Sequence, residues 1–352
     1  MTKPTRVAVN GYGVIGKRVA DAVRVQRDMT LVGVADVATD WRTRVLQDRG
    51  VQLFAATPQA GVELRAAGVP TAGDLDDLLD EADVIVDCTP KRVAADNVPL
   101  YRDRGLKFVL QGGEKHAVTG HSFVSEANFE TAVGREATRV VSCNTTATVR
   151  TLGALKRAGL LLRARGVLLR RATDPWESHL GGIMNTLVPE PEIPSHQGPD
   201  AQTVDPDLDV VTMAVRVPET IAHLHYWSIQ MTRTADKDEV LDALRSSSRI
   251  LLMKDAYGLN ALNAVKELMA DRCRSRSDLY EVALWANMLK VQGDELFYAY
   301  MVDNQAIVVP ETIDAIRALD GREISGRRSI AATDLAMGIE GGLFSEAGSR
   351  TT

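Results

Sequence analysis

The 352-residue sequence predicts an α/β protein in which a doubly wound parallel sheet comes first and an α+β domain with a mixed or antiparallel sheet follows. Three observations lead to this prediction. From residue 6 to about residue 140, short β-branched runs alternate with helical spacing, which is typical of a parallel sheet. A glycine-rich turn stands between the first strand and the first helix. Beyond about residue 166, longer strand-like runs with few helical crossovers indicate a second kind of sheet.

The glycine-rich turn has the spacing of a dinucleotide-binding motif. Residues 6–10 read as a strand, residues 17–26 have helical spacing, and Gly11, Gly13 and Gly16 form G-x-G-x-x-G between them. In this context the first glycine makes a tight turn and the second lets the backbone approach a pyrophosphate. The third allows the helix to pack closely on the strand. The sequence therefore predicts a Rossmann-type domain.

The second strand, residues 31–35, ends at Asp36, 20 residues after Gly16. A carboxylate at that point accepts hydrogen bonds from ribose hydroxyls and repels a 2′-phosphate, so Asp36 favours NAD as cofactor, with NADP also possible. Gly113 follows a strand expected at 107–110, and loops at such strand ends line the ligand crevice. The other elements expected in this half are a strand at 52–57, a buried strand that runs into a turn at 84–90, and helices at 61–67, 75–81 and 92–104.

A cysteine stands at the next boundary between a strand and a helix. Residues 140–142 end a β-branched run and residues 147–157 have helical spacing, which puts Cys143 near a helix N-terminus. We expect the positive end of the helix dipole to lower the pKa of this thiol and to favour the nucleophilic thiolate. A small, buried structural cysteine is the alternative interpretation.

The second half of the chain contains candidate partners for this thiol. His223 and His225 lie two residues apart in an expected strand, 221–231, so both imidazoles point to one face of a sheet, and we expect one of them to face Cys143. Arg170 and Arg171 end another expected strand, 166–171.

A long irregular segment, 172–206, follows this strand, and segments of that length inside a compact chain are usually functional. It contains His196, and together with the arginine pair it offers donors for a phosphate or another oxyanion. A solvated basic pair and an ordinary loop histidine are the alternative. The remaining elements are expected as strands at 210–217, 249–253, 280–289 and 296–302 and helices at 237–246, 259–269, 311–319 and 330–339.

These elements suggest three ranges: a dinucleotide-binding domain at 1–142, a catalytic domain at 143–324, and a C-terminal helix and tail at 325–352 that pack back on the first domain. Composition fits a globular protein, with 45% apolar and 25% charged residues and a net charge of −6. We expect no nucleic-acid partner, because no basic and aromatic cluster stands out. No apolar run reaches the about 20 residues of a membrane span, and no signal-peptide core precedes the first strand. With three widely separated cysteines and no metal-binding spacing, we expect a cytoplasmic protein without a metal site.

The sequence resembles the archaeal (type II) glyceraldehyde-3-phosphate dehydrogenase family nearly end to end. Besides the glycine motif, the matching segments are Asp87-Cys88-Thr89-Pro90, Gln111-Gly112-Gly113-Glu114-Lys115, Val141-Ser142-Cys143-Asn144-Thr145-Thr146, Arg170-Arg171-Ala172-Thr173-Asp174-Pro175, Pro194-Ser195-His196, Gly198-Pro199-Asp200 and His223-Leu224-His225. The resemblance implies a phosphorylating, NAD(P)-dependent oxidoreductase of glycolysis. It would convert D-glyceraldehyde 3-phosphate and inorganic phosphate to 1,3-bisphosphoglycerate, as a homotetramer.

The resemblance also implies roles for individual residues. Cys143 attacks the aldehyde and becomes a thioester, while His223 acts as base and stabilises the oxyanion. Cofactor contacts are implied for Val14, Ile15, Gly113 and Arg171, with Asn304 bonding the carboxamide. Substrate contacts are implied for Ser142, Asn144, Thr145, Arg170, His196, Gln197 and Gly198.

Four departures from the family pattern leave alternatives open. Gln197 replaces the second of two adjacent histidines, so a neutral amide stands in an anion site. Asp36 replaces a basic residue suited to NADP, Asp303-Asn304-Gln305-Ala306 replaces His-Gln-Glu-Ser, and Ala147-Thr148-Val149 replaces Gly-Leu-Cys. The alternatives are a specialised paralogue for another phosphorylated or phosphonylated aldehyde and an enzyme that reduces an acyl phosphate to a semialdehyde. A non-catalytic, NAD-binding regulatory protein is an alternative of another class.

Overall fold

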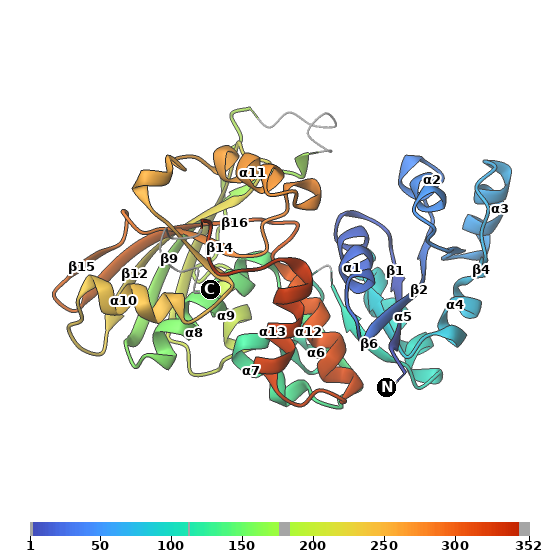
Figure 1. The fold of residues 1–352 in the computed structure, drawn as a ribbon, viewed down its shortest axis with the longest axis horizontal. Helices are drawn as coiled ribbons and strands as arrows, with labels where there is room; N and C mark the ends of the chain where they lie inside the picture. The colour runs from blue at the N-terminus through green and yellow to red at the C-terminus, as the bar shows by residue number, and fades with distance from the viewer. Residues whose placement is uncertain (1–2, 112, 176–183, 345–352) are drawn as a thin grey trace, which may run out of the picture. The chain divides into compact units, whose positions relative to one another are not determined.

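The computed structural model describes residues 3–111, 113–175 and 184–344, and the chain divides into two compact units (Figure 1). Unit 1 consists of Met1–Val141 and Val308–Met337, and unit 2 of Ser142–Ile307 and Gly338–Thr352. The predicted ranges 143–324 and 325–352 divide the C-terminal part differently, because the whole segment from Val308 to Met337 belongs with unit 1.

The sheet of unit 1 is parallel throughout its described strands, in the order β4-β3-β2-β1-β5-β6-β8-β7. The predicted doubly wound sheet is therefore confirmed. Its strands are β1 (Thr5–Asn10), β2 (Met29–Asp36), β3 (Leu53–Ala55), β4 (Gly73–Asp74), β5 (Val84–Asp87), β6 (Lys107–Leu110), β7 (Ser122–Phe123) and β8 (Ala137–Val140). The helices of this part are α1 (Val14–Arg24), α2 (Trp41–Asp48), α3 (Pro58–Ala66), α4 (Leu75–Glu81), α5 (Val93–Asp103), α6 (His116–Thr119), α7 (Ser125–Ala132), α12 (Val308–Asp320) and α13 (Gly326–Met337).

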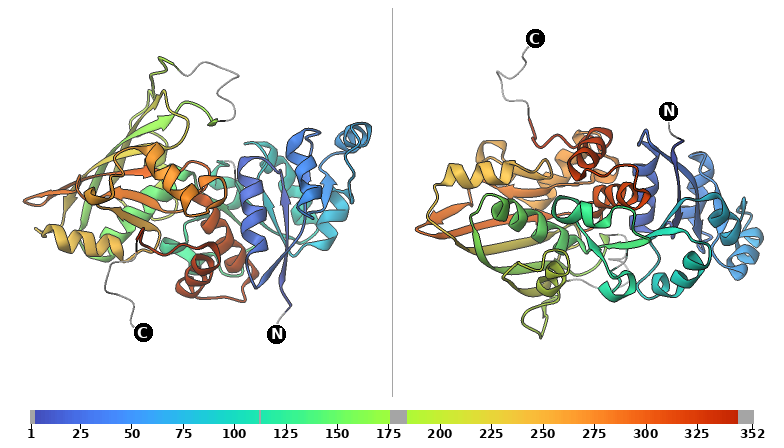
Figure 2. Two further views of the ribbon diagram at one scale, coloured as in Figure 1. Left: turned by 45° about the horizontal axis from the view of Figure 1, so that its top comes forward. Right: turned by 90° about the horizontal axis from the view of Figure 1, so that it is seen from below.

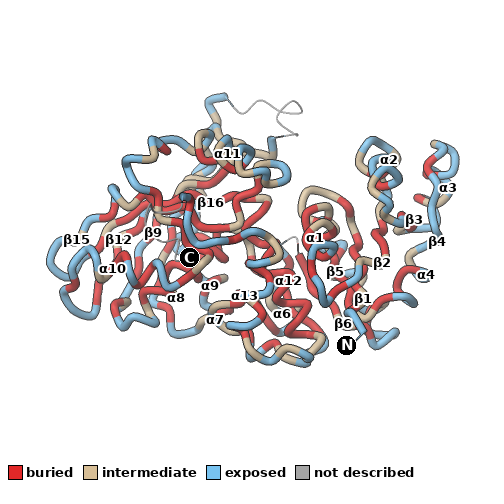
Figure 3. Tube along the Cα trace, viewed as in Figure 1, coloured by how far each residue is buried: buried red, intermediate tan, exposed pale blue. Residues whose placement is uncertain are grey.

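Helix α12 is buried along almost its whole length, from Val308 to Leu319 (Figure 3). It packs against strands β6 and β8 and against α1, α7 and α13, all within unit 1. The sequence places this helix after the strands of the second half, but a helix whose residues are buried on all sides must lie in a core. This packing explains why residues 308–324 group with the dinucleotide-binding unit and not with the catalytic one.

The sheet of unit 2 is mixed, as predicted, in the order β10-β11-β9-β12-β16-β14-β13 with β15 on β16. Strand β9 is parallel to β11, β13 is parallel to β14, and the other pairs are antiparallel. The strands are β9 (Leu161–Arg171), β10 (Val188–Pro189), β11 (Val210–Val217), β12 (His223–Met231), β13 (Ile250–Met253), β14 (Val282–Trp285), β15 (Lys290–Gln292) and β16 (Glu295–Val302). The helices are α8 (Cys143–Arg157), α9 (Gln197–Gln202), α10 (Lys237–Arg245) and α11 (Leu262–Asp271), with 3-10 turns η2 (Asp255–Tyr257) and η3 (Ser275–Ser277).

Helix α8 lies on one face of this sheet, against β9 and β16, with α9 and α10 beside it (Figure 2). It begins at Cys143, four residues before the predicted start. The predicted irregular segment at 172–206 contains β10 and α9 in its described part, and residues 176–183 lie outside the described residues.

Short elements of unit 1 were not predicted, and α2 shows why. Only Thr43 and Leu46 of this helix are buried, so it has no apolar stripe. The helix starts at the side chain of Asp40, which accepts a hydrogen bond from the Arg42 amide. Across the described part of the chain, no helix is both long and apolar enough to span a membrane.

Candidate active site

The nucleophile candidate occupies the first position of α8. Ser142 caps this helix, its Oγ accepting a hydrogen bond from the Thr145 amide at 3.3 Å. The Thr145 hydroxyl donates to Asp200 of α9 at 2.9 Å. These contacts pin the first turn of α8 to α9 and set the direction of the side chain at Cys143.

Cys143 and His223 lie together, with 3.3 Å between Sγ and Nε2. His223, the first residue of β12, is almost completely buried. The backbone N–H of Arg171 donates to Nδ1 of His223 at 3.0 Å. Because an amide N–H only donates, Nδ1 must accept, and the neutral ring carries its proton on Nε2, on the side of the sulfur.

The electrostatics of this pair differ from the prediction. Burial raises the pKa of the Cys143 thiol to about 11, against the opposing effects of the Arg171 charge, the Asn144 backbone N–H and the Arg170 charge. Burial, with the nearby His225 and the two arginines, also lowers the pKa of His223 well below its usual value. The expected lowering of the thiol pKa at the helix terminus is therefore wrong for this structure, because desolvation outweighs it. The resting pair is a neutral thiol beside a neutral imidazole.

The second histidine of the strand contacts the next residue of α8. His225 Nε2 lies 2.8 Å from Oδ1 of Asn144, and both residues are buried. As predicted from the two-residue period, both imidazoles point to one face of the sheet. They contact two consecutive residues of α8, Cys143 and Asn144.

A carboxylate contacts two of the predicted anion-binding residues, Arg170 and His196. Glu190, which follows β10, bonds Nη1 of Arg170 and lies 3.1 Å from Nδ1 of His196. Glu190 was not predicted from the sequence, because it lies in the irregular segment, where no periodicity indicates a side chain's direction.

Gln197, the residue that departs from the family pattern, is fully buried. Among the described residues, neither its Oε1 nor its Nε2 has a hydrogen-bond partner. Burying an amide without hydrogen-bond partners costs free energy. This indicates that a ligand or a water bonds the Gln197 amide. The neighbouring Gly198 N–H donates to the hydroxyl of Thr212 at 3.0 Å, which fixes the start of α9 on β11.

Two predicted cofactor residues of unit 2 meet at an unpredicted carboxylate. Asp174 accepts from Nη2 of Arg171 at 3.2 Å, from Nδ2 of Asn304 at 3.2 Å and from Nε2 of Gln305 at 3.1 Å. Asp174 thus joins Arg171, at the end of β9, to Asn304, just after β16.

The glycine motif in unit 1 has the close packing that the prediction requires. Gly11 has a φ of +90°, and a Cβ there would lie 3.0 Å from the backbone of Cys88 and Thr89. A Cβ on Gly16 would lie 1.8 Å from the Gly11 carbonyl oxygen, so only glycine fits. Gly13 is the N-cap of α1, and it has no side chain to bond the first amides of the helix. The amides around Val14 and Ile15 are therefore suited to bind a phosphate.

Asp36 lies beside this turn. Its carboxylate accepts from the Tyr12 amide at 2.5 Å and from the Ala38 amide at 2.7 Å. Gly113 has a φ of +77°, a backbone conformation that favours glycine. These residues of unit 1 fit a dinucleotide, with backbone amides for the pyrophosphate and a carboxylate for the ribose.

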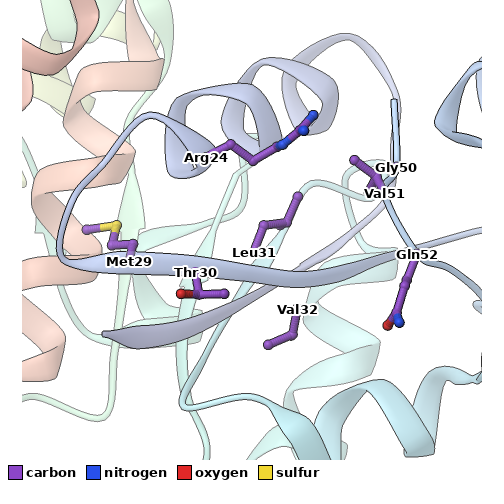
Figure 4. Close-up of a pocket in the computed structure, with 8 residues that line it drawn as sticks. All are labelled: Arg24, Met29, Thr30, Leu31, Val32, Gly50, Val51 and Gln52. Atoms are coloured by element: carbon purple, nitrogen blue, oxygen red, sulfur yellow. The ribbon is translucent and has the colours of Figure 1, made fainter. Parts of the chain in front are cut away.

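A hollow of about 490 Å³ in unit 1 lies elsewhere (Figure 4). It is lined by Arg24, by Met29, Thr30, Leu31 and Val32 at the start of β2, and by Gly50, Val51 and Gln52. Because Asp36 is at the opposite end of β2, this hollow is not part of the predicted cofactor site.

Known protein families match segments of both units. Residues 5–145 match the family model "Dihydrodipicolinate reductase, N-terminus", and residues 142–278 match "Glyceraldehyde 3-phosphate dehydrogenase, C-terminal domain". A glyceraldehyde-3-phosphate dehydrogenase of Methanobrevibacter smithii is 42% identical over 335 residues, which cover 95% of this chain and 99% of that protein. The enzyme of the same name from Metallosphaera sedula is 43% identical over 335 residues, 95% of this chain and 98% of that protein. The one from Haloarcula marismortui is 41% identical over 343 residues, 97% of this chain and 96% of that protein.

Proposed function

Since the chain belongs to the glyceraldehyde-3-phosphate dehydrogenase family, we propose that it oxidises D-glyceraldehyde 3-phosphate, with NAD and inorganic phosphate, to 1,3-bisphosphoglycerate. It is an NAD(P)-dependent oxidoreductase. The observation that carries the proposal is the contact of 3.3 Å between Cys143 Sγ and His223 Nε2 at the start of α8. Another aldehyde, an acyl-phosphate reductase and a non-catalytic binding protein are not favoured by relatives that are about 40% identical and bear this enzyme's name.

Cys143 is the proposed nucleophile. Its sulfur forms a bond to the aldehyde carbon, and the thiol proton passes to the aldehyde oxygen, which gives a hemithioacetal on the enzyme. When bound, NAD supplies the hydride acceptor for the oxidation. Loss of the carbon-bound hydride to this acceptor and of the hydroxyl proton to water then leaves a thioester on Cys143.

His223 is proposed as the donor beside these atoms. Its Nε2–H faces Sγ and stabilises negative charge first on sulfur and then on the oxygen of the hemithioacetal. A role as base, which the family resemblance implies, requires an unprotonated Nε2. For this the proton must shift to Nδ1, and the Arg171 N–H must leave that nitrogen.

Inorganic phosphate completes the proposed reaction. An oxygen of hydrogen phosphate attacks the thioester carbon, and the carbon–sulfur bond breaks. The Cys143 thiolate takes the proton of the phosphate as the acyl phosphate leaves. Arg170 and His196 are the proposed anion ligands, with Gly198 beside them. Gln197, whose amide has no partner among the described residues, is proposed to bond the substrate.

Unit 1 is proposed to bind the dinucleotide. Gly11, Gly13, Val14, Ile15 and Gly16 would hold the pyrophosphate with backbone groups. Asp36 would bind the adenosine ribose and favour NAD over NADP, and Gly113 would approach the cofactor with its backbone. Arg171 and Asn304 are the cofactor contacts that the family resemblance implies in unit 2.

We also propose a cytoplasmic homotetramer. The three cysteines are unbridged, which fits a reducing compartment.

The proposed subunit interface lies on the sheet face opposite α8. Three apolar side chains are adjacent there in the register of β11, β9 and β12: Met213, Val167 and Tyr226. They are exposed and line a hollow of about 450 Å³, and such contiguous apolar surface is typical of an interface. In sedimentation velocity, Tyr226→Glu is expected to shift the tetramer to smaller species. The control Val62→Glu, at an exposed site on α3, is expected to leave the tetramer unchanged. A monomeric wild type contradicts the proposed tetramer.

The thioester is the species that tests the proposed reaction. The protein is mixed with glyceraldehyde 3-phosphate and NAD without inorganic phosphate, quenched in acid and digested. Mass spectrometry is expected to find the acyl group on the peptide that contains Cys143. The acyl group is expected to disappear when phosphate is added and to be absent in Cys143→Ser. Acylation elsewhere, or none, refutes the assignment of Cys143.

A further inference from the structure

His225 lies between two polar side chains in the interior of unit 2. Its Nδ1 is 3.0 Å from the hydroxyl of Tyr300, and its Nε2 is 2.8 Å from Oδ1 of Asn144. His225 and Tyr300 are direct neighbours in the register of β12 and β16, and both side chains have no exposed surface. The three residues form one buried chain of hydrogen bonds that ends beside Cys143.

The direction of each hydrogen bond follows from the chemistry of the groups. The Asn144 Oδ1 can only accept, so His225 Nε2 donates to it. A neutral ring with its proton on Nε2 has an accepting Nδ1, and the Tyr300 hydroxyl therefore donates to Nδ1. The ring stays neutral, because burial and the Arg170 charge lower the pKa of His225 to about 3.

This series of hydrogen bonds leaves the amide nitrogen of Asn144 available to bond a ligand. Its Oδ1 is taken by His225, and no described residue accepts a hydrogen bond from Nδ2. Asn144 directly follows Cys143 in the first turn of α8, and its backbone N–H opposes the rise of the Cys143 pKa. Hydrogen bonds in a row polarise one another, so donation into Oδ1 makes the Nδ2 protons better donors.

We propose that His225 and Tyr300 are positioning residues that hold the Asn144 amide so that its Nδ2–H groups donate to the oxygen of the hemithioacetal. The inference rests on the proposed function and adds to it two residues that do not touch the substrate. On this account the hemithioacetal oxygen has two donors, Nε2 of His223 and Nδ2 of Asn144, and each is aligned by a second residue. The Arg171 N–H aligns His223, and His225 aligns Asn144.

Tyr300→Phe is the first test, because it removes one hydroxyl and keeps the ring. Its matched control is Tyr298→Phe on the same strand, where the buried hydroxyl has no hydrogen-bond partner among the described residues. The readout is the single-turnover rate of NADH formation with saturating glyceraldehyde 3-phosphate. Tyr300→Phe is expected to lower this rate about fivefold with the KM for the aldehyde unchanged, and Tyr298→Phe to change neither. Equal rates for the two variants overturn the proposal.

A double-mutant cycle separates positioning from a structural effect, since the side chains of Thr148 and Thr151 of α8 also lie near the Tyr300 hydroxyl. Asn144→Ala alone is expected to lower the rate by about 100-fold, as the loss of an oxyanion donor does. In that background Tyr300→Phe is expected to have almost no further effect. A full fivefold loss in the Asn144→Ala background shows that Tyr300 acts by another route and overturns the proposal.

His225→Gln provides a second variant, since its amide can still donate toward Asn144. It is expected to retain more of the rate than His225→Leu, with both variants checked for an unchanged melting temperature. Equal losses in the two overturn the positioning role. The wild type is measured in the same assay. No NADH from the wild type refutes the proposed function. An active wild type together with variants of unchanged rate refutes only the positioning role of His225 and Tyr300.

Discussion

The backbone N–H of Arg171 donates to Nδ1 of His223 at 3.0 Å, so a residue at the end of β9 determines the tautomer of the histidine beside Cys143. A charged imidazolium needs protons on both nitrogens, and a proton on Nδ1 would face this N–H. The geometry therefore disfavours a thiolate–imidazolium pair in the resting enzyme and favours a neutral donor.

Nitrogen NMR of ¹⁵N-histidine-labelled protein tests this tautomer. From pH 6 to pH 8, His223 is expected to show a protonated Nε2 and an unprotonated Nδ1, with His223→Asn used to assign the signal. The reason is the Arg171 N–H together with burial, which lowers the pKa of His223. An imidazolium signal over this range, lost on alkylation of Cys143, contradicts the account.

The buried histidines also predict how stability depends on pH. The folded-state pKa values of His223 and His225 lie below the unfolded value of about 6.5, so below pH 6.5 the unfolded chain binds protons that the folded chain does not. Their contribution is complete above pH 6.5 and is lost as the pH falls, by about 3 kcal/mol per pH unit for the two together. Urea unfolding at pH 7, 6 and 5, followed by tryptophan fluorescence, measures this slope. His225→Gln is expected to have a shallower slope, and equal slopes would rule out a neutral, buried His225.

The sequence predicted those features that depend on local chemistry. The glycine spacing around Gly11 and Gly16 predicts its turn because only glycine fits there, and the two-residue period predicts that His223 and His225 share a face. The tautomer of His223 depends on the pairing of two strands distant in the sequence, which no local pattern specifies. Glu190 lies in an irregular segment without periodicity. The thiol pKa depends on desolvation by the whole fold, which the helix-dipole argument left out.

Asp36 is predicted to discriminate against NADP. Asp36→Ser removes the negative charge that repels a 2′-phosphate, so kcat/KM with NADP is expected to rise about tenfold relative to that with NAD. The matched control is Asp40→Ser, because Asp40 is an exposed carboxylate that caps α2 and serine can keep that cap. An unchanged ratio in Asp36→Ser, or an equal rise in the control, shows that Asp36 does not read the ribose.

Glu190 is predicted to compete with the anionic ligand for Arg170 and His196. Glu190→Gln removes the charge but keeps the shape, so the KM for inorganic phosphate is expected to fall about fivefold, equivalent to about 1 kcal/mol. Glu192→Gln, two residues further on and exposed, serves as control and is expected to leave KM unchanged. A higher KM in Glu190→Gln would mean that the carboxylate orients Arg170 for the anion.

The most direct test of the central claim is steady-state NADH formation from glyceraldehyde 3-phosphate, with and without inorganic phosphate. NAD and NADP are compared side by side, and Cys143→Ser is the blank. We predict turnover that requires phosphate, prefers NAD and is lost in Cys143→Ser. Turnover that persists in Cys143→Ser, or that does not depend on phosphate, contradicts a phosphorylating dehydrogenase that works through a thioester on Cys143.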